Sequence, residues 1–429
     1  MTVQQLTSSA TPNSETGFDY DIAIVGGSVA GTTLAAALKD SGLSVALIEA
    51  VPQSVAASRN KVYATSLLSG QIFQGIGVWE KIQPKITTFY QISLSDSGIE
   101  GVRFKPTDLQ TEALGYVAEH QELLPVLQEF LEERCSNVTW ICPVEVVGIE
   151  YRDDGAILEM QPVGEPQTEE TRRIRTRLIV AADGARSRIR TQAGIQTRGW
   201  KYWQSCVTVK VKPEKAHHNI AYERFWPSGP FAILPLTGNR CNIVWTSPHA
   251  EAKALAQLDD AEFLAELKKR YGDAMGELEL IGDRQVFPVQ LMQSDRYVQP
   301  RLALIGDAAH CCHPVGGQGL NLGIRDAAAI AQVLSDAHQN REDIGDLAVL
   351  RRYERWRKLE NLIILGFTDF LDRLFSNNFP PFVALRRLGL WCVRNLPFVK
   401  RFALRLMTGQ TGRHPQNIKP LPLKVSVQS

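Results

Sequence analysis

The segment Gly306–Ala327, GDAAHCCHPVGGQGLNLGIRDA, carries a dense set of chemically reactive side chains. Two histidines and two cysteines also form the ligand set of many zinc sites, but zinc ligands come in separated pairs because adjacent side chains diverge. We therefore expect no metal here. Cys311 and Cys312 are interpreted as small packing residues rather than as a disulfide or reactive thiols. Two interpretations stay open for His310 and His313: contact with a ligand, or hydrogen bonds within the loop.

The sequence around this segment predicts the elements that hold it. LALIG, at residues 302–306, is a short apolar run that predicts a buried strand. Asp307 then lies at the carboxyl end of that strand, where open α/β sheets bind ligands. Pro314 and the glycines that follow it predict an irregular loop. LNLGIRDAAAIAQVLSDA predicts a helix whose first N–H groups favour a negatively charged ligand.

A βαβ unit with a glycine-rich first turn is predicted for residues 20–50, YDIAIVGGSVAGTTLAAALKDSGLSVALIEA. Gly26 allows a tight turn, Gly31 lets the helix pack on the strand, and Ser28 takes the middle position usually held by glycine. The carboxylate of Glu49, at the end of the second strand, can accept hydrogen bonds from ribose hydroxyls. The pattern predicts a site for FAD or NAD, formed by Gly26, Gly27, Ser28, Ala30, Gly31 and Glu49.

A third segment, RLIVAADGARSRIR at residues 177–190, predicts a strand that ends at Asp183-Gly184. Asp183, Ser187 and Arg190 have the spacing and chemistry to hydrogen-bond sugar hydroxyls and phosphates. A strand end followed by a capped helical turn explains the same residues without a ligand, since Asp-Gly is common in turns. Both interpretations stay open at this point.

Composition favours a globular protein of the reduced cytoplasm. The chain has 429 residues and a formal net charge of +1, so nucleic-acid binding has no overall electrostatic support. Its seven cysteines form no CxxC pair. Residues 1–17 contain neither Lys nor Arg and no apolar core, so we expect a disordered tail rather than a signal or transit peptide. No apolar run approaches the roughly 18 residues of a transmembrane helix.

The three segments, in this order and spacing, resemble the class A flavoprotein monooxygenases, aromatic hydroxylases with the fold of para-hydroxybenzoate hydroxylase. Further stretches are similar to the UbiH/UbiF/VisC family of ubiquinone-biosynthesis hydroxylases, over about residues 18–409: KVYATSLLSGQIFQGIGVWEKI, LGYVAEHQELLPVL, AYERFWPSGPFAILPL, GQGLNLGIRDA, YERWRKLEN and TDFLDRLFSN. The chain departs from these relatives at Ser28, at Lys61, where an arginine is usual, and at His120-Gln121, where Asn-Arg is frequent.

The resemblance implies a tightly bound FAD, reduced by transiently bound NAD(P)H, that transfers one oxygen atom of O2 to an electron-rich ring. Pro314 would lie beside the reacting face of the flavin, with His313 as a second catalytic candidate, and no metal is implied. Besides the residues of the first turn and Glu49, the implied FAD contacts are Lys61, Gln121, Asp183, Gly184, Asp307, Pro314, Gly317, Gly319, Leu320, Asn321 and Leu322.

The implied fold class is α/β, a Rossmann-like FAD-binding domain interleaved with a mixed-sheet substrate domain, plus C-terminal helices. The FAD-binding segments would be 18–85, 110–195 and 295–340, and the substrate segments 86–109 and 196–294. A helical region, 345–409, and a basic tail, 410–429, would follow. The implied substrate is a lipophilic, (poly)prenylated phenol or quinone precursor, and the residues expected to line its pocket are Tyr222, Phe225, Phe231 and Leu234.

Two other functions stay open. A prenyl reductase or an epoxidase has the same FAD motifs, and a non-catalytic flavin-bound subunit of a quinone-synthesis complex would also keep them. A halogenase is disfavoured, because WKYW at residues 200–203 does not match the W-x-W-x-I-P signature of that class.

The C-terminal stretch FPPFVALRRLGLWCVRNLPFVKRFALRLMTG predicts basic amphipathic helices beyond Asp372, the last acidic residue of the chain. Leu385, Leu388 and Trp391 form an apolar stripe at helical spacing, and Arg386 lies off that stripe. Two interpretations stay open. The helices lie peripherally on an anionic membrane surface, or they pack on the FAD domain with a solvated basic face.

Overall fold

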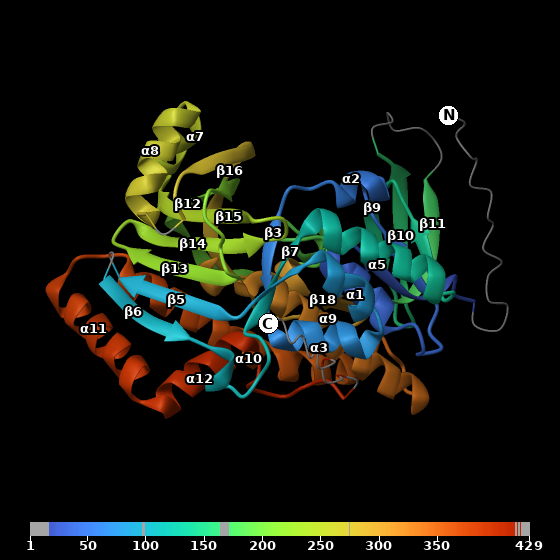
Figure 1. Cartoon of the computed structure of the whole chain (residues 1–429). Coiled ribbons are helices and arrows are strands. Elements are labelled where there is room, and N and C mark those ends of the chain that lie inside the picture. Colours follow the sequence, from blue (N-terminus) through green and yellow to red (C-terminus); the bar gives the residue numbers. More distant parts are fainter. Residues whose placement is uncertain are drawn as a thin grey trace.

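The computed structural model of the chain describes residues 17–96, 99–163, 171–273, 275–416, 418 and 421. The tails predicted at 1–17 and 410–429 therefore lie largely outside the described residues. The described residues form two large sheets joined by a small three-stranded sheet, with helices packed on both (Figure 1).

The first sheet is built around five parallel strands in the order β18-β11-β1-β2-β8. Its central strands are continuous apolar runs because helices cover both faces of a parallel sheet. Antiparallel β17 pairs with β18, and β10 and β9 extend the sheet from β11. The strands are β1 (Tyr20–Val25), β2 (Val45–Ile48), β8 (Val138–Ile141), β9 (Val144–Tyr151), β10 (Ala156–Pro162), β11 (Arg172–Ala181), β17 (Val298–Gln299) and β18 (Leu302–Leu304).

Helices on this sheet close the main hydrophobic core, and α9 packs against both α1 and α10. The small sheet has the order β3-β7-β4 and stands between the two large sheets, with β3 at Val62–Thr65, β4 at Thr87–Phe89 and β7 at Gly115–Glu119. The helices of this half are α1 (Val29–Ala37), α2 (Gln53–Ala57), α3 (Leu67–Ile76), α4 (Trp79–Ile82), α5 (His120–Arg134), α6 (Arg188–Gln192), α9 (Gln318–Gln339) and α10 (Leu347–Phe375).

The second sheet is mixed, in the order β19-β16-β12-β15-β14-β13-β5-β6. Residues 86–109 contribute β5 and β6 to it, and β19 joins it from within 295–340. One face is covered by α7 (His249–Gln257) and α8 (Asp260–Tyr271) (Figure 1). Its strands are β5 (Gln91–Asp96), β6 (Ile99–Phe104), β12 (Thr197–Pro213), β13 (Ile220–Trp226), β14 (Gly229–Leu236), β15 (Arg240–Pro248), β16 (Leu278–Ser294) and β19 (His310–Cys311).

The C-terminal helices α11 (Pro380–Asn395) and α12 (Pro397–Thr408) lie beside β6 and α10 (Figure 1). Their apolar stripe is exposed to solvent instead of packed on the FAD half, while Arg386 points inward and is buried. We call the exposed side chains the C-terminal apolar strip: Phe379, Phe382, Leu385, Leu388, Trp391, Phe398 and Phe402. Within the described residues, no helix combines the length and the apolar character needed to cross a membrane.

Candidate active site

The predicted ligand residues meet at one edge of the parallel sheet. Gly26, Glu49 and Asp183 each follow the carboxyl end of a strand, β1, β2 and β11, and Asp307 follows β18 in the same way. Parallel strands place these ends at a common edge, and backbone hydrogen bonds continue past the strands there. The N–H of Gly26 donates to Ile48 O at 2.8 Å, and the N–H of Ala182 donates to Val25 O at 2.7 Å.

The first turn has no room for side chains. Gly26 adopts φ +114°, and a Cβ on Gly31 would lie 1.9 Å from the Gly26 carbonyl oxygen. Ser28 has φ −81°, so the serine at the middle position is accommodated without strain. Its side chain makes no capping hydrogen bond, which leaves the first N–H groups of α1 for a ligand.

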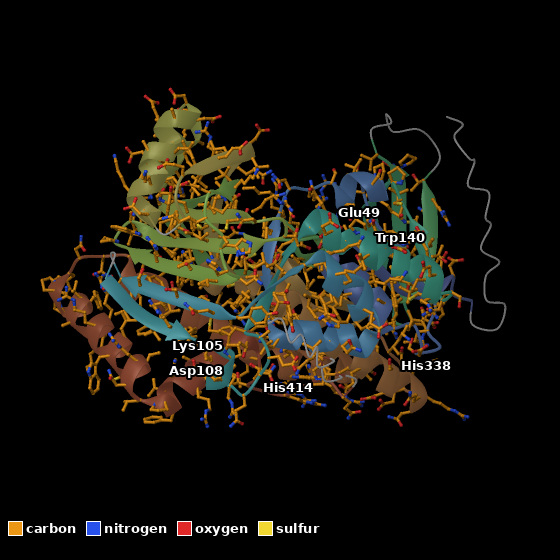
Figure 2. The ribbon with its side chains drawn as sticks, in the orientation of Figure 1. Glu49, Lys105, Asp108, Trp140, His338 and His414 are labelled. Carbon is orange, nitrogen blue, oxygen red and sulfur yellow. The ribbon has the colours of Figure 1, made fainter. Side chains whose placement is uncertain are left out.

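Glu49 and Trp140 flank Gly27 on this edge. The Glu49 carboxylate accepts hydrogen bonds from the N–H groups of Gly27 at 2.7 Å and Ala50 at 3.0 Å. A Cβ on Gly27 would lie 2.7 Å from the Trp140 ring, and Figure 2 shows Glu49 and Trp140 in the same part of the molecule. The Trp140 Nε1–H is buried and meets no hydrogen-bond partner within the described part of the chain. Trp140 could not be singled out from the sequence, because its position depends on the pairing of β8 with β2.

The Asp183-Gly184 turn contains one carboxylate oxygen that protein groups leave unsatisfied. Burial raises the pKa of Asp183, and its buried Oδ1 has no hydrogen-bond partner among the residues that the structure describes. Gly184 has φ +85° and faces open space. By contrast, Ser187 caps α6 by accepting from the N–H of Arg190, whose guanidinium donates to Ala308 O at 2.8 Å. Ser187 and Arg190 therefore serve the scaffold, and Arg190 ties this turn to the loop after β18.

Asp307 lies in a concave surface. Its side chain is accessible to solvent, yet desolvation by the surrounding protein raises its pKa, opposed by the charges of His310 and Lys61. That combination is typical of a side chain that lines a hollow rather than a convex surface. Across from it, the Tyr63 hydroxyl lies 2.9 Å from Nδ1 of His120, and the charge of Asp307 helps to raise the Tyr63 pKa.

Lys61 and Gln121, two predicted cofactor contacts near Asp307, have different side-chain environments. Lys61 is exposed and near enough for its charge to lower the Asp307 pKa. Gln121 is also exposed, but its Nε2 donates to Ser58 O at 3.0 Å, so it supports the neighbouring loop. The structure therefore brings Lys61 to the hollow and gives Gln121 a protein partner.

The glycine loop and the start of α9 complete the edge. Gly317 adopts φ +62° as the N-cap of α9, which has no side-chain cap, and a Cβ there would lie 2.8 Å from that of Ala64. Pro314 is partly exposed. Gly319 is less constrained, because a Cβ there would meet only Cys312 Sγ, at 4.0 Å.

The side chains of Asn321 and Leu322 make their contacts within the protein. Asn321 Oδ1 accepts from Ser66 N–H at 2.8 Å, and its Nδ2 donates to Ala64 O and Gly317 O, each at 2.8 Å. Leu322 is fully buried, whereas Leu320 is partly exposed. Asn321 and Leu322 can therefore meet a cofactor only through their backbone.

The two histidines of HCCH have separate environments. His310 Nε2 lies 2.6 Å from Asp326 Oδ2, and β19 holds His310 in register with Gln293 of β16. His313 is fully buried, and burial lowers its pKa to about 3. Because Val315 N–H donates to His313 Nδ1, the proton of the neutral ring is on Nε2. His313 Nε2 lies 3.4 Å from Gln204 Oε1, and its ring makes an edge contact with Tyr202.

None of the cysteines takes part in a disulfide. All seven are among the described residues and are free, and burial raises the pKa of the Cys312 thiol to about 12. Among the described residues, no group of three or more His, Cys, Asp or Glu side chains could hold a metal ion.

Strand alternation divides the four predicted substrate residues between two faces of the second sheet. Tyr222 and Phe231 belong to the cluster under α7 and α8, away from the cofactor edge. Phe225 and Leu234 lie on the opposite face, which we call the inner face. Phe225 packs in one cluster with Val315, the residue after Pro314. Of the four, only Phe225 and Leu234 lie on the face that meets the loop at Pro314.

The residues at the sheet edge fit FAD. Two helices, α1 and α9, begin there without side-chain caps, which suits the diphosphate and a negatively charged flavin ring. The carboxylates of Glu49, Asp183 and Asp307 can accept hydrogen bonds from sugar and ribityl hydroxyls. The buried Oδ1 of Asp183, which no described protein group satisfies, can be satisfied by such a hydroxyl.

Comparison with known proteins agrees with this fit. Residues 19–359 match the family described as FAD binding domain. An uncharacterized protein of Synechocystis is 52% identical, over 92% of this chain and 95% of that protein. The ubiquinone hydroxylase UbiL of Rhodospirillum rubrum is 36% identical, over 92% of this chain and 91% of that protein.

Among solved structures, p-nitrophenol 4-monooxygenase from Pseudomonas putida shares the fold, with a TM-score of 0.76 and 18% identity over 92% of this chain and 98% of that chain. Motifs, site geometry and relatives agree, and the chain belongs to the family of FAD-dependent monooxygenases that includes the hydroxylases of ubiquinone biosynthesis.

Proposed function

We propose that this monooxygenase hydroxylates the aromatic ring of a lipophilic, (poly)prenylated phenol of quinone synthesis, using NAD(P)H and O2. The observation that carries the proposal is the inner face of the second sheet. There Leu234 is partly exposed, and the buried Phe225 belongs to one apolar cluster with Val315, the residue after Pro314. A prenylated ring is apolar over most of its surface, so this face offers it the complementary environment. The activity named for the Rhodospirillum rubrum relative points the same way.

Each part of the site has a task in this reaction. FAD, when bound and reduced, supplies the oxygen transfer. The uncapped start of α9 and the loop at Pro314 would hold the flavin ring, and Asp307 would orient its ribityl chain. The apolar side chains of the inner face would exclude water from the reacting atoms. Glu49 and the first turn would fix the adenosine diphosphate part.

The test is oxygen incorporation into a defined probe. Purified, FAD-loaded protein receives NADPH or NADH, 2-farnesylphenol and 18O2, and the product is analysed by mass spectrometry. We expect reductant oxidation stimulated by the phenol and one 18O atom in the ring. A saturated prenyl double bond without oxygen uptake would establish a reductase, and oxygen on the prenyl chain an epoxidase. FAD binding with no turnover of any phenol would favour a non-catalytic subunit.

We also propose that the C-terminal apolar strip rests on an anionic membrane surface, where a polyprenyl substrate would be found. Phe398 is 72% exposed, Phe402 63% and Trp391 57%. Exposed arginines accompany the strip: Arg387, Arg394, Arg401 and Arg405. Apolar side chains bordered by cations are typical of helices that lie in the headgroup region.

Vesicle sedimentation tests this surface. We expect the full chain to bind vesicles of phosphatidylglycerol and phosphatidylcholine, and to bind pure phosphatidylcholine more weakly. The double variant Leu388→Glu, Trp391→Glu should lose binding, whereas Val163→Glu, at an apolar residue 46% exposed just after β10, should not. Equal binding by both variants would contradict the membrane contact. A strip that binds no vesicle would instead suit a protein partner of a quinone-synthesis complex.

A further inference from the structure

One carboxyl group lies in the middle of the apolar inner face. Glu223 is on β13 between Ala221 and Phe225, and alternation along the strand turns all three side chains to the same face. Its neighbours in register are Leu94 of β5 and Ala232 of β14. Ala221 and Phe225 belong to two apolar clusters, so Glu223 stands between them.

Glu223 makes no hydrogen bond or ion pair with any residue that the structure describes. The other carboxylates near this face all have partners. Glu119 pairs with Lys210 at 2.6 Å and Arg240 at 2.7 Å, and Asp96 pairs with Arg386 at 2.8 Å. A carboxyl group with no protein partner on an apolar face keeps its hydrogen-bonding capacity free for a ligand.

The protonation state of Glu223 follows from this isolation. Burial alone raises its pKa to about 8, because no nearby cation stabilises the carboxylate. The side chain is nevertheless partly accessible to solvent. Glu223 therefore opens into a confined space, as a group lining a binding pocket does, and it is neutral at pH 7.

Glu223 lies near a side chain that packs in one cluster with the loop at Pro314. Phe225 is two residues along the strand from Glu223, about 7 Å, and it packs with Val315 of the flavin loop. Leu234 of β14 is partly exposed on the same face, so a ring bound beside it would bring its substituents within reach of Glu223.

We propose that Glu223, as a neutral carboxylic acid, donates a hydrogen bond to an oxygen substituent of the aromatic substrate and so fixes which ring carbon faces the flavin. This inference rests on the proposed function, since it requires an oxygen-bearing ring. No proton is transferred: the carboxyl keeps its hydrogen and the ring oxygen accepts.

The surroundings of Glu223 contribute few charges that would titrate in the same range. Burial raises the pKa of the Cys206 thiol on β12 to about 12, and Glu223 and Asp372 of α10 contribute in the same direction. Other titratable groups on or against this face are Lys210 of β12 with Glu119 of β7, Asp96 of β5 with Arg386 of α11, Asp369 of α10 with Tyr202 of β12, and His313 of the flavin loop.

Three variants of the FAD-loaded full chain test the proposal with 2-farnesylphenol as the probe. Glu223→Gln keeps a hydrogen-bond donor of the same shape, and Glu223→Leu removes that donor. Glu251→Gln is the control, because it removes a carboxylate from α7, on the other side of the sheet. KM and kcat are measured from pH 6.5 to 9.5, with the ratio of hydroxylated isomers as a further readout.

We expect the wild-type KM to rise about tenfold above pH 8, as the donor is lost. Glu223→Gln should show a flat, low KM, and Glu223→Leu a KM about tenfold higher at every pH with a mixture of isomers. Glu251→Gln should follow the wild type. Equal behaviour of the Gln and Leu variants would overturn the proposal. So would a wild-type rate that increases with pH and is lost in Glu223→Gln, because that result makes Glu223 a base.

Thermal unfolding tests the state of the carboxyl without substrate. A raised folded-state pKa means that the wild type loses stability as pH rises from about 4.3, the unfolded value, through 8. Glu223→Gln avoids this loss, so its Tm should match the wild type near pH 4.5 and exceed it above pH 8. A pH-independent difference would overturn the neutral-acid state. If no phenol binds the wild type while the Tm prediction holds, the proposed function and the substrate contact both fail.

Discussion

Arg386 of α11 donates a hydrogen bond from Nε to Oδ2 of Asp96 in β5 at 2.8 Å, and both side chains are less than a tenth exposed. The same guanidinium donates to the carbonyl oxygens of Phe375 and Asn377. α11 is therefore fixed to the second sheet through its polar side, and its apolar stripe is left facing outward.

Replacement of Arg386 by Ala should lower the free energy of unfolding by about 3–5 kcal/mol, because it leaves a buried carboxylate without its cation. Chemical denaturation measures the difference. Arg387→Ala removes the neighbouring exposed arginine and should change the free energy by no more than about 0.5 kcal/mol. Similar effects for the two variants would show that the buried pair does not hold α11.

Gly31→Ala should prevent FAD binding. Its Cβ would lie 1.9 Å from the Gly26 carbonyl oxygen, so the first turn would have to open. Flavin absorbance of the purified protein measures the loss, which we expect to be nearly complete. Gly366→Ala, at an open position within α10, serves as the control. It should keep full flavin content and gain about 0.5–1 kcal/mol of stability, and a yellow Gly31→Ala protein would contradict the prediction.

Asp307→Asn should weaken FAD binding about 10- to 100-fold, the range for loss of a charge-assisted hydrogen bond. Fluorescence titration of the apoprotein with FAD measures the change in Kd. Asp40→Asn, at a residue 85% exposed, should bind FAD as the wild type does. An unchanged Kd for Asp307→Asn would remove Asp307 from the cofactor contacts.

Acid should weaken the attachment of α9 to α10 through Asp326. This buried carboxylate accepts from His310, Arg357 and Asn361, and although burial raises its pKa, the charges of His310 and Arg357 lower it to about 2. A lowered folded-state pKa stabilises the protein above the unfolded value of about 3.9, and this contribution is lost as pH falls to 2.

Asp326→Asn should therefore unfold about 3–5 kcal/mol more easily at pH 7, with the gap to the wild type narrowing below pH 4. Denaturation curves at several pH values measure the gap, again with Asp40→Asn as the control. A gap that is constant between pH 2 and 7 would mean that the charge of Asp326 is not what stabilises the contact.

The sequence best predicted those parts of the site that depend on backbone conformation alone. The turn from Gly26 to Gly31 and the αL conformation of Gly317 follow from local chain geometry, which glycine spacing reports directly. The carboxylates at strand ends were also predictable, because parallel strands share one ligand-binding edge.

Side-chain direction was harder to predict. Tyr222 and Phe225 are three residues apart on one strand, and only the pairing of β13 decides which of them faces the flavin loop. Trp140 contacts Gly27 because of the register of β8 with β2. Arg386 points inward because it pairs with Asp96, which lies on a strand distant in the sequence. Such relationships depend on long-range contacts that no local pattern contains.

The position of β18 in the chain also determines the order in which the parts of the site are synthesised. β18 pairs with β11 in the sheet but comes much later in the chain. The first turn and Glu49 are therefore synthesised long before the strand and the loop that complete the cofactor edge. A growing chain that ends before Asp307 has an open edge at β11 and lacks the uncapped start of α9. An FAD molecule that needs both sides of this edge can therefore stabilise the polypeptide only after the start of α9 has been synthesised.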